Sequence, residues 1–343
     1  MGGVRASHPG AARGSRAVIA EVPGAGAVHG VPAGARHGAI GDAAFRGLAF
    51  FFALLVLLLL GGIVLALIWG ALPALAAFGP AFFVTSVWNP VTDRFGALAP
   101  IYGTVVTSAI AMLIGIPVAF GIALFITELS PNRLKRPLAT MIELLAAIPS
   151  IIYGIWGFFV LAPVVQEYVE PALIGSLGRL PGVGLLFRGP PLGIGVLTAG
   201  FILAVMVLPF ISAIMRDVFE TVPPVLKESA YALGATTTEV VWRVVLPYTR
   251  IGVLGGILLG LGRALGETMA VTFVIGNSHH ISASILQPGT TISAALANEF
   301  TEAIGDLYQS SLIALGLILF FITFIVLAIA KLLLIRLQQR AGG

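Results

Sequence analysis

The stretch ESAYALGATTTEVVWRVVLP, from Glu228 to Pro247, is a polar insert between two long apolar segments, and a Pro-Pro pair shortly precedes it. Proline in this place suits the start of a helix, and Gly234 suits the end of one. Thr236 and Glu239 have the spacing of a capping box, so we expect a second helix that stops at Pro247. The pattern predicts a short helix–turn–helix between membrane spans, which can act as a rigid handle for a separate driving protein.

The composition predicts an integral membrane protein. The 343 residues are 58% hydrophobic and only 10% charged, with a mean hydropathy of +1.04, whereas a soluble globular chain has roughly 25% charged residues. A helix needs about 20 mostly apolar residues to cross a bilayer. Segments of this kind predict an all-α fold with six transmembrane helices. Their approximate ranges are 46–70, 101–126, 139–165, 192–215, 250–276 and 307–333.

The distribution of lysine and arginine predicts the orientation, because cations in short loops are retained on the cytoplasmic side. Of the 19 cations, 15 fall on one side of the predicted spans. These are Arg5, Arg13, Arg16, Arg36, Arg46, Arg133, Lys135, Arg136, Arg216, Lys227, Arg243, Arg250, Lys331, Arg336 and Arg340. Arg94, Arg179 and Arg188 fall on the other side, and Arg263 lies inside a span. Both termini and the 228–247 insert are therefore expected in the cytoplasm.

The chain divides into a tail and one membrane domain. Residues 1–44 are rich in glycine, alanine and arginine without an apolar period, which predicts a disordered cytoplasmic tail before a domain at 45–340. The apolar core of the first span exceeds the roughly 7 to 15 residues of a signal peptide, so an uncleaved anchor is expected. No cysteine is present, and the adjacent His279 and His280 lack further ligands, so no metal site is expected.

Two ionisable residues lie inside the predicted fifth span, where a charge at the centre costs about 2.5–3.5 kcal/mol. Arg263 and Glu267 are four residues apart, so on a continuous helix they share one face and can pair. Gly252, Gly256 and Gly260 fall on the same stripe, and glycine at every fourth position lets another helix approach closely. The stripe is therefore expected to face a neighbouring helix or a pathway.

Two interpretations of this pair stay open. In the first, Arg263 and Glu267 form a structural ion pair at a helix interface. In the second, Arg263 lines an anion pathway, because its planar guanidinium stays charged and binds phosphate-like oxyanions through two N–H groups. Glu267 then holds Arg263 in place and offsets its charge. Glu143, near the cytoplasmic start of the third predicted helix, is expected to have a structural role.

The insert resembles the EAA loop of bacterial ABC importer permeases, in which Glu-Ala-Ala is followed by a glycine and later by Ile-x-Leu-Pro. The resemblance implies that the insert couples the membrane domain to an ATPase. Ser229 replaces the first alanine and Val244 the isoleucine, and both departures are conservative. The matching positions that the resemblance assigns to ATPase coupling are Glu228, Ser229, Ala230, Gly234, Leu246 and Pro247.

A second stretch, GRALGETMAVTFVIGN from Gly262 to Asn277, resembles the fifth-helix signature of the PstC family of phosphate-specific permease subunits. With the EAA loop and the six-span layout, the resemblance covers residues 45–340. It implies a type I ABC importer permease (MetI-like) fold in the bacterial inner membrane and assigns Arg263 and Glu267 to the substrate pathway. The long N-terminal tail departs from the family pattern.

The resemblance also implies partners and places the energy source outside this chain. The expected partners are a PstA-like second permease subunit, a PstB-like pair of ATPase subunits and a PstS-like extracytoplasmic phosphate-binding protein. A G-x-x-x-x-G-K-[ST] loop is absent, so no cofactor is expected on this chain, and ATP and Mg²⁺ belong to the partner ATPase. The chain is therefore expected to be a transporter subunit and not an enzyme.

Other functions are compatible with part of this sequence pattern. The cargo could be another oxyanion such as molybdate or sulfate, or the chain could be a secondary transporter driven by an ion gradient. A DNA-binding helix-turn-helix is disfavoured, because the second helix of the insert offers only Arg243 for phosphate contacts and membrane spans flank the insert. An intramembrane enzyme is disfavoured because no H-E-x-x-H motif is present.

Overall fold

The computed structural model describes the backbone of residues 35–341 and the side chains of residues 41–336. The chain divides into two units at Gly61 and Gly62, and each is described by itself. In the first unit the described residues belong to one helix, α1, which spans Ala35–Phe78 and continues past the boundary. Here α1 is apolar on every side, which is typical of a helix surrounded by lipid or by other spans.

The second unit is helical, and no β-strand occurs in residues 62–341 apart from one isolated bridge between Asn89 and Arg94. Its longest helices are α3 (Leu98–Leu124), α8 (Val196–Glu220), α11 (Leu246–Leu265) and α14 (Asp306–Ala341). Shorter α-helices connect them, which are α2 (Ala81–Val84), α4 (Asn132–Ala146), α5 (Ser150–Trp156), α6 (Ala162–Val164), α7 (Glu170–Ser176), α9 (Pro224–Ala232), α10 (Thr237–Val240), α12 (Met269–Thr272) and α13 (Ile292–Glu299).

π-Helical turns and 3₁₀ turns interrupt or extend several of these helices. The four π-helical segments are η1 (Phe125–Leu129), η2 (Gly157–Leu161), η3 (Val165–Val169) and η6 (Val241–Val245). The two 3₁₀ segments are η4 (Leu177–Arg179) and η5 (Val183–Phe187). Counting these turns with the helices that they join gives six segments long and apolar enough to cross a membrane, which confirms the predicted number. They are Gly41–Phe78, Leu98–Leu129, Ser150–Arg179, Val196–Glu220, Thr237–Leu265 and Asp306–Arg336.

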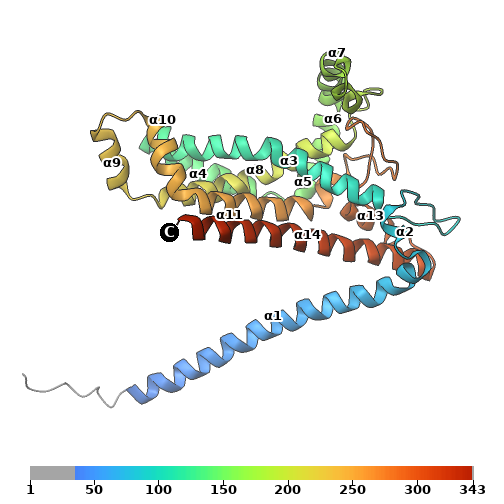
Figure 1. The fold of residues 1–343 in the computed structure, drawn as a ribbon, viewed down its shortest axis with the longest axis horizontal. Coiled ribbons are helices and arrows are strands. Elements are labelled where there is room, and N and C mark those ends of the chain that lie inside the picture. Colours follow the sequence, from blue (N-terminus) through green and yellow to red (C-terminus); the bar gives the residue numbers. More distant parts are fainter. Residues whose placement is uncertain (1–34, 342–343) are drawn as a thin grey trace, which may run out of the picture. The chain divides into compact units, whose positions relative to one another are not determined.

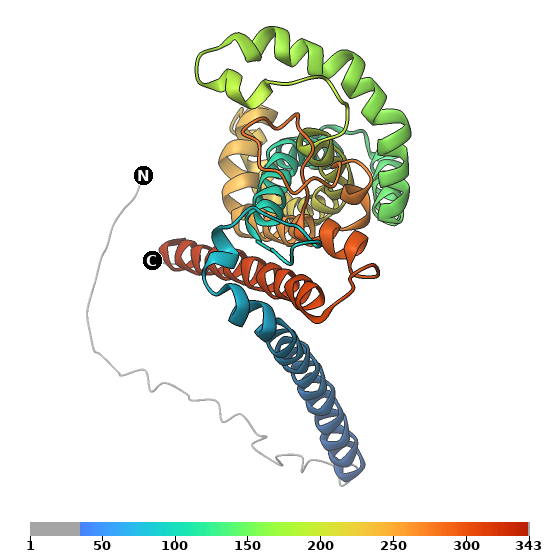
Figure 2. The ribbon, with the colours of Figure 1, turned by 90° about the vertical axis from the view of Figure 1, so that its right-hand side faces the viewer.

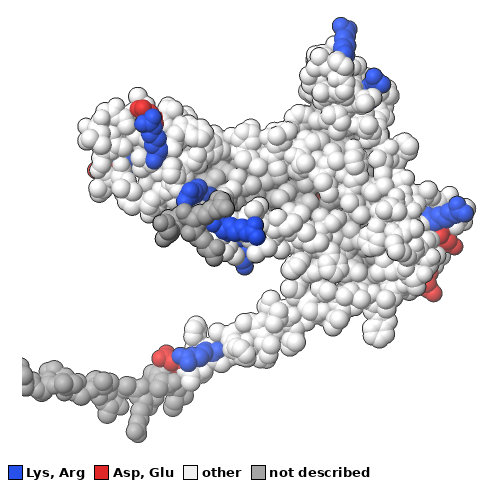
Figure 3. Space-filling view, viewed as in Figure 1, with Lys and Arg blue, Asp and Glu red and all other residues white. Residues whose placement is uncertain are grey.

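Helix α8 is the centre of the second unit. Its side chains include Ile202, Leu203, Ile211 and Met215, which are all fully buried. Helices α3 and α11 pack against α8, and α14 packs against α11 (Figure 1). The other spans keep most of their apolar surface exposed within this chain, as expected where lipid or a second subunit covers it. Figure 3 shows charged side chains gathered toward the two ends of these helices and almost none between them.

The two ends of the second unit differ. Helices α9 and α10 lie at one end together with the C-terminal end of α14, whereas α2 and α13 lie at the other (Figure 1; Figure 2 looks onto the α13 end). The charge distribution predicts that the insert and the C-terminus share the cytoplasmic side, and the structure brings both to one end. We therefore refer to the α9 end as cytoplasmic and to the α13 end as extracytoplasmic.

The predicted third helix, 139–165, is wrong in its bounds. The chain is helical in α4, turns at Ala147, and starts the third span only at Ser150, after Pro149. Proline lacks a backbone N–H and pushes the residue before it out of the helical conformation, so Pro149 ends one helix and begins the next. Glu143 therefore lies on a separate amphipathic helix and not in a span.

Three further expectations are corrected. The predicted helix 250–276 ends at Leu265, where Gly266 stops it, and only α12 is helical beyond this point before α13. Pro247 does not stop a helix, because the segment continues through it from η6 into α11. The predicted tail, 1–44, lies outside the described residues up to position 34, but from Ala35 onward it forms the first turns of α1.

Candidate functional site

The insert is built by local capping interactions. Helix α9 ends at Ala232, and Gly234 reverses the chain with a φ of +88°, a conformation that glycine adopts without strain. The Thr236 hydroxyl accepts a hydrogen bond from the Glu239 N–H at 3.4 Å, and the Glu239 carboxylate accepts one from the Thr236 N–H at 2.9 Å. This is the predicted capping box, and it fixes the start of α10.

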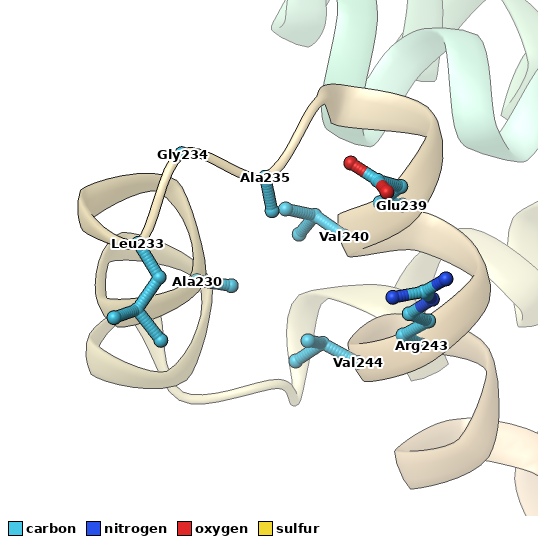
Figure 4. A pocket seen from close by; sticks show the side chains of 8 residues that line it. All are labelled: Ala230, Leu233, Gly234, Ala235, Glu239, Val240, Arg243 and Val244. Carbon is cyan, nitrogen blue, oxygen red and sulfur yellow. The ribbon is translucent and has the colours of Figure 1, made fainter.

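The two helices of the insert pack through small apolar side chains. Val240 is fully buried, and Ala230, Ala235 and Val244 pack against the same cluster. Figure 4 shows Val240 and Val244 pointing from the second helix toward α9, across a pocket of about 340 Å³. Ala230 and Ala235 therefore contribute small side chains to the contact between the two helices of the insert.

The outer surface of the insert is free for a partner. Glu228 is exposed and forms no ion pair with the described residues, and Ser229 is exposed with its hydroxyl donating to the Val225 carbonyl at 2.7 Å. Leu233 at the tip is 90% exposed. An unpaired carboxylate beside an exposed leucine is suited to a protein contact, because one supplies charge complementarity and the other apolar area.

Continuity through Pro247 depends on the π-turn η6. The Leu246 N–H donates to the carbonyl of Val241, five residues earlier, instead of to the residue four earlier. The wider turn accommodates the proline ring, which would otherwise clash with the carbonyl four residues before it. Leu246 and Pro247 therefore form a continuous helical connection between the insert and α11.

Two ion pairs join helices at the cytoplasmic end, and the first of them links α9 of the insert to the second span. The Lys227 Nζ lies 2.5 Å from the Glu128 carboxylate at the cytoplasmic end of the second span, and the Glu128 side chain is only 6% exposed. Arg216 at the end of α8 pairs with Glu143 of α4 at 2.9 Å. The insert is thus linked to the second span as well as to the fifth, and the structural role expected for Glu143 has a partner.

The glycine stripe faces α8, as the spacing predicts for a close helix interface. A Cβ at Gly252 would lie 2.6 Å from Val218, one at Gly256 would lie 2.9 Å from Ile214, and one at Gly260 would lie 2.5 Å from Ile211; these distances are to side-chain atoms. Such distances leave no room for a side chain. The β-branched residues of α8 fill the groove that the glycines leave.

Arg263 lies in the last turn of α11 and is exposed, with its guanidinium carbon 5.7 Å from the centre of the Phe210 ring. The free carbonyl groups at the C-terminal end of a helix favour a cation, and an aromatic face adds to this. A positive charge is therefore stabilised at the point where the fifth span breaks.

The structure does not pair Arg263 with Glu267. Because α11 ends at Leu265, Glu267 is not on the same helical face, and among the described residues no ion pair joins the two side chains. The Glu267 carboxylate instead accepts a hydrogen bond from the Ala270 N–H at 3.3 Å, which caps the start of α12. The structural ion pair of the first interpretation is therefore wrong, as is the part of the second in which Glu267 holds Arg263 in place, and Arg263 has no ion-pair partner among the described residues.

A cluster at the extracytoplasmic end joins the segments that carry Trp88 and His279 to α13 and to the first turn of α14, around Glu299. The carboxylate accepts hydrogen bonds from Trp88 at 2.6 Å and Tyr308 at 2.7 Å and contacts the His279 Nε2 at 2.7 Å. The rings of Trp88 and His279 are stacked. Burial raises the pKa of Glu299, but the hydrogen bonds to His279, Tyr308 and Trp88 outweigh it and hold the pKa below its ordinary value.

Sequence reasoning missed Lys227 with Glu128, the Glu299 cluster and Glu170, which is completely buried. Lys227 and Glu128 are 99 residues apart, so no local spacing could relate them. Glu170 accepts a hydrogen bond from the Gly193 N–H at 3.0 Å. Glu170 follows the predicted third span in a polar stretch that also contains Glu167, so the sequence carried no signal that it is buried.

These features define a class of protein. A six-span helical subunit with a capped cytoplasmic insert, joined rigidly to a span that carries an unpaired arginine, is a membrane permease built to be moved by a partner. The family of the binding-protein-dependent transport system inner membrane component matches residues 111–339.

Relatives that the chain matches over nearly their whole length indicate the type of permease. The phosphate transport system permease protein PstC of Mesorhizobium japonicum (strain LMG 29417 / CECT 9101 / MAFF 303099) is 61% identical over 90% of this chain and 94% of that protein. The PstC of Xylella fastidiosa (strain 9a5c) is 59% identical over 86% of this chain and 93% of that protein. A chain in the crystal structure of a bacterial alginate ABC transporter in complex with alginate pentasaccharide-bound periplasmic protein shares the fold, with a TM-score of 0.55 and 17% identity over 84% of this chain and 94% of that one.

The chain therefore belongs to the binding-protein-dependent transport system inner membrane components, and within them to the PstC-type permeases. It has the type I ABC importer permease (MetI-like) fold that its sequence predicts, and it is a transporter subunit and not an enzyme.

Proposed function

We propose that this chain is one of two permease subunits of an ATP-driven importer of inorganic phosphate. The observation that carries the proposal is the unpaired, exposed Arg263 at the broken end of α11, in a chain 61% identical to a phosphate permease. An arginine that lacks a carboxylate partner at membrane depth attracts an oxyanion, because its fork of N–H groups matches two phosphate oxygens.

The arrangement around Arg263 supports a pathway role. Irregular backbone at membrane depth is tolerated where it is buried in protein or lines a water-filled cavity, and the break at Gly266 supplies such backbone. Glu267 caps α12 and so fixes the segment that follows Arg263. Arg263 then binds the anion, while Glu267 sets the geometry of the break and keeps the local net charge low enough for the anion to leave.

The insert supplies the coupling. Glu228, Ser229 and Leu233 form the surface that docks on a PstB-like ATPase pair, which binds ATP and Mg²⁺ in place of this chain. ATP binding closes the ATPases and moves the insert, and the rigid connection through Leu246 and Pro247 passes this motion to α11. A PstA-like second permease completes the pathway, a PstS-like binding protein delivers phosphate, and the complex resides in the bacterial inner membrane.

The test is ATP hydrolysis by the reconstituted complex with its binding protein. Phosphate is expected to stimulate hydrolysis, whereas equal concentrations of sulfate and molybdate are not. Stimulation by sulfate or molybdate but not by phosphate would show that the complex imports another oxyanion by the same mechanism. A parallel assay uses proteoliposomes that contain this chain alone, where ion-gradient-driven phosphate uptake without any ATPase would identify a secondary transporter instead.

A further inference from the structure

A cavity of about 770 Å³ opens at the extracytoplasmic end, and Arg263 is not among its lining residues (Figure 2 looks onto this end). Two segments form it, one at 185–192 before α8 and one at 276–288 between α12 and α13. Cavities of this size are typical of small-molecule sites. The polar or charged side chains in its lining are Arg188, Ser278, His280, Ser282, Ser284 and Gln287.

The lining offers hydrogen-bond donors and no carboxylate. Arg188 is exposed to the cavity and pairs with no acidic side chain among residues 41–336. The hydroxyl oxygens of Ser278 and Ser282 accept hydrogen bonds from the N–H groups of His280 and Ser284 at 3.4 and 3.1 Å. Each of these hydroxyls keeps its own O–H to donate to a ligand.

A buried amide without a partner belongs to Gln287, and we call the part of the lining that this residue forms the base of the cavity. The Gln287 Nε2 is shielded from solvent and has no hydrogen-bond acceptor among the described residues. It borders a second, more enclosed chamber of about 10 Å³ that shares His280, Ser282 and Ser284 with the larger cavity, which is room for about one water molecule or one ligand oxygen. An unpaired buried donor costs about 1–3 kcal/mol, so a ligand oxygen here regains a lost interaction.

The cavity is held in shape before any ligand arrives. The Ile285 N–H donates to the Leu186 carbonyl at 3.0 Å, which joins the two segments, and the Val196 N–H donates to the Gln287 carbonyl at 3.2 Å, which fixes the base to α8. Next in sequence to the lining residue Leu192, the Gly193 N–H donates a hydrogen bond to the buried Glu170 carboxylate at 3.0 Å. A preformed set of donors binds an anion without a further ordering cost.

We propose that this cavity is a receiving site for a small inorganic oxyanion on its way from the binding protein to Arg263. Arg188 supplies the charge, Ser278 and Ser282 donate from the sides, and the Gln287 amide donates from the base. A lining with several donors and no carboxylate favours a small oxyanion as the occupant, and a carboxylate on a docked protein surface is the alternative that the test distinguishes. The choice of phosphate as probe rests on the proposed function.

The test measures direct binding of radiolabelled inorganic phosphate to the purified complex in nanodiscs without the binding protein. An Arg263→Gln background removes the pathway site, so that only the receiving site contributes. Arg188→Gln is expected to weaken binding by about tenfold or more, and Arg188→Lys to restore part of it. Arg179→Gln is the control, because Arg179 is exposed in η4, before the first segment of the cavity, and is not one of the lining residues. The Arg179→Gln complex is expected to bind phosphate like the background complex.

Gln287→Glu provides a second variant of similar size that places a negative charge at the base. It is expected to abolish phosphate binding, and recovery of the assembled complex is the control for folding. Equal binding by the Arg188→Gln, Gln287→Glu and background complexes overturns the proposal, as does an absence of oxyanion binding by the background complex. Unchanged phosphate binding with lost capture of the binding protein would make the cavity a protein docking surface. Binding of sulfate or molybdate in place of phosphate, with the same dependence on Arg188, would support the oxyanion site and contradict phosphate as the cargo.

Discussion

At the scale of single residues, Arg263 owes its position to the end of a helix. A charge inside an unbroken apolar span needs a paired carboxylate, but the last turn of α11 offers free carbonyl groups and the Phe210 ring instead. The arginine is therefore stable without a partner that would neutralise it. This leaves its N–H groups available to an anion, which a paired arginine could not offer.

Arg263→Gln is expected to reduce phosphate uptake by the reconstituted complex by at least about tenfold, equivalent to about 1.4 kcal/mol of lost stabilisation. Arg263→Lys keeps the charge but not the planar fork and is expected to retain partial uptake. Both variants should assemble normally, because Arg263 holds no ion pair in the described residues. Failure of Arg263→Gln to assemble would assign the residue to structure and not to the pathway.

Glu299 acts at the same scale outside the membrane. Its pKa is lower in the folded state than in the unfolded state, so its stabilisation is fully present above the unfolded value of about 4.3 and is lost as the pH falls through the folded value. Glu299→Gln is expected to lower the unfolding temperature of the complex by about 2–4 °C at neutral pH and to weaken its acid dependence. Glu302→Gln, at an exposed position nearby, is the control. An unchanged acid dependence in Glu299→Gln would contradict this role.

At the scale of elements, the contact between α11 and α8 depends on the absence of side chains. Gly260→Val is expected to destabilise the complex by about 1–3 kcal/mol, because the new Cβ lies 2.5 Å from Ile211 in a packed interface. Gly255→Ala is the matched control on the same helix, since nothing lies within 4 Å of its Cβ. Thermal unfolding of the purified complex separates the two, and equal unfolding temperatures would show that the glycine stripe is not the interface.

The elements also show what the sequence could predict. Hydropathy predicts the six spans because a span must be apolar and must form its backbone hydrogen bonds within its own helix. The capping box is predictable because its hydrogen bonds join residues three positions apart and do not depend on tertiary packing. Pro149 and Gly266 break helices that hydropathy joins, because apolar composition does not record the backbone conformation. Pro247, by contrast, does not break the helix, because the π-turn η6 that precedes it makes room for the proline ring.

The candidate site was predictable to the extent that it is local. Gly252, Gly256 and Gly260 share a face at helical spacing, and the structure confirms that this face contacts a neighbouring helix. Pairing of Arg263 with Glu267 assumed a continuous helix and was wrong. Contacts between distant segments, such as Lys227 with Glu128, arise only from packing, and a single sequence carries no spacing that relates them.

The Lys227–Glu128 pair links the insert to the second span, so we expect it to transmit the ATPase motion. Breaking a largely buried pair leaves one charge without compensation, so Lys227→Glu is expected to reduce phosphate-stimulated ATP hydrolysis several-fold. The double variant Lys227→Glu with Glu128→Lys restores opposite charges and is expected to recover most of the coupling. Hydrolysis stimulated equally in the single variant and the unchanged complex would exclude this link.

At the scale of the whole molecule, the proposed function makes the cytoplasmic end the place where the ATPase acts on the membrane spans. The insert reaches α11 through a continuous helical segment and reaches the second span through Lys227. Both of these spans pack against α8, which is the most buried of the six. A displacement at the insert therefore acts on the two spans beside α8, and it does so at the end of α11 opposite to Arg263. The insert surface that meets the ATPase should then control uptake without touching the anion.

Glu228→Arg tests this separation. The side chain is exposed and unpaired in the described residues, so the fold of the membrane domain should not change, whereas a reversed charge at the docking surface should weaken ATPase attachment. We expect co-purification of the ATPase with Glu228→Arg to fall by about tenfold or more, because like charges at an interface cost several kcal/mol. Glu220→Arg reverses an exposed charge at the same end but outside α9 and should retain the ATPase. Phosphate binding to the Glu228→Arg complex should stay unchanged, since no ion pair or hydrogen bond to the side chain of Glu228 occurs in the described residues. If the ATPase co-purified in full and uptake continued, the insert would not be the handle, and force would have to enter the spans elsewhere.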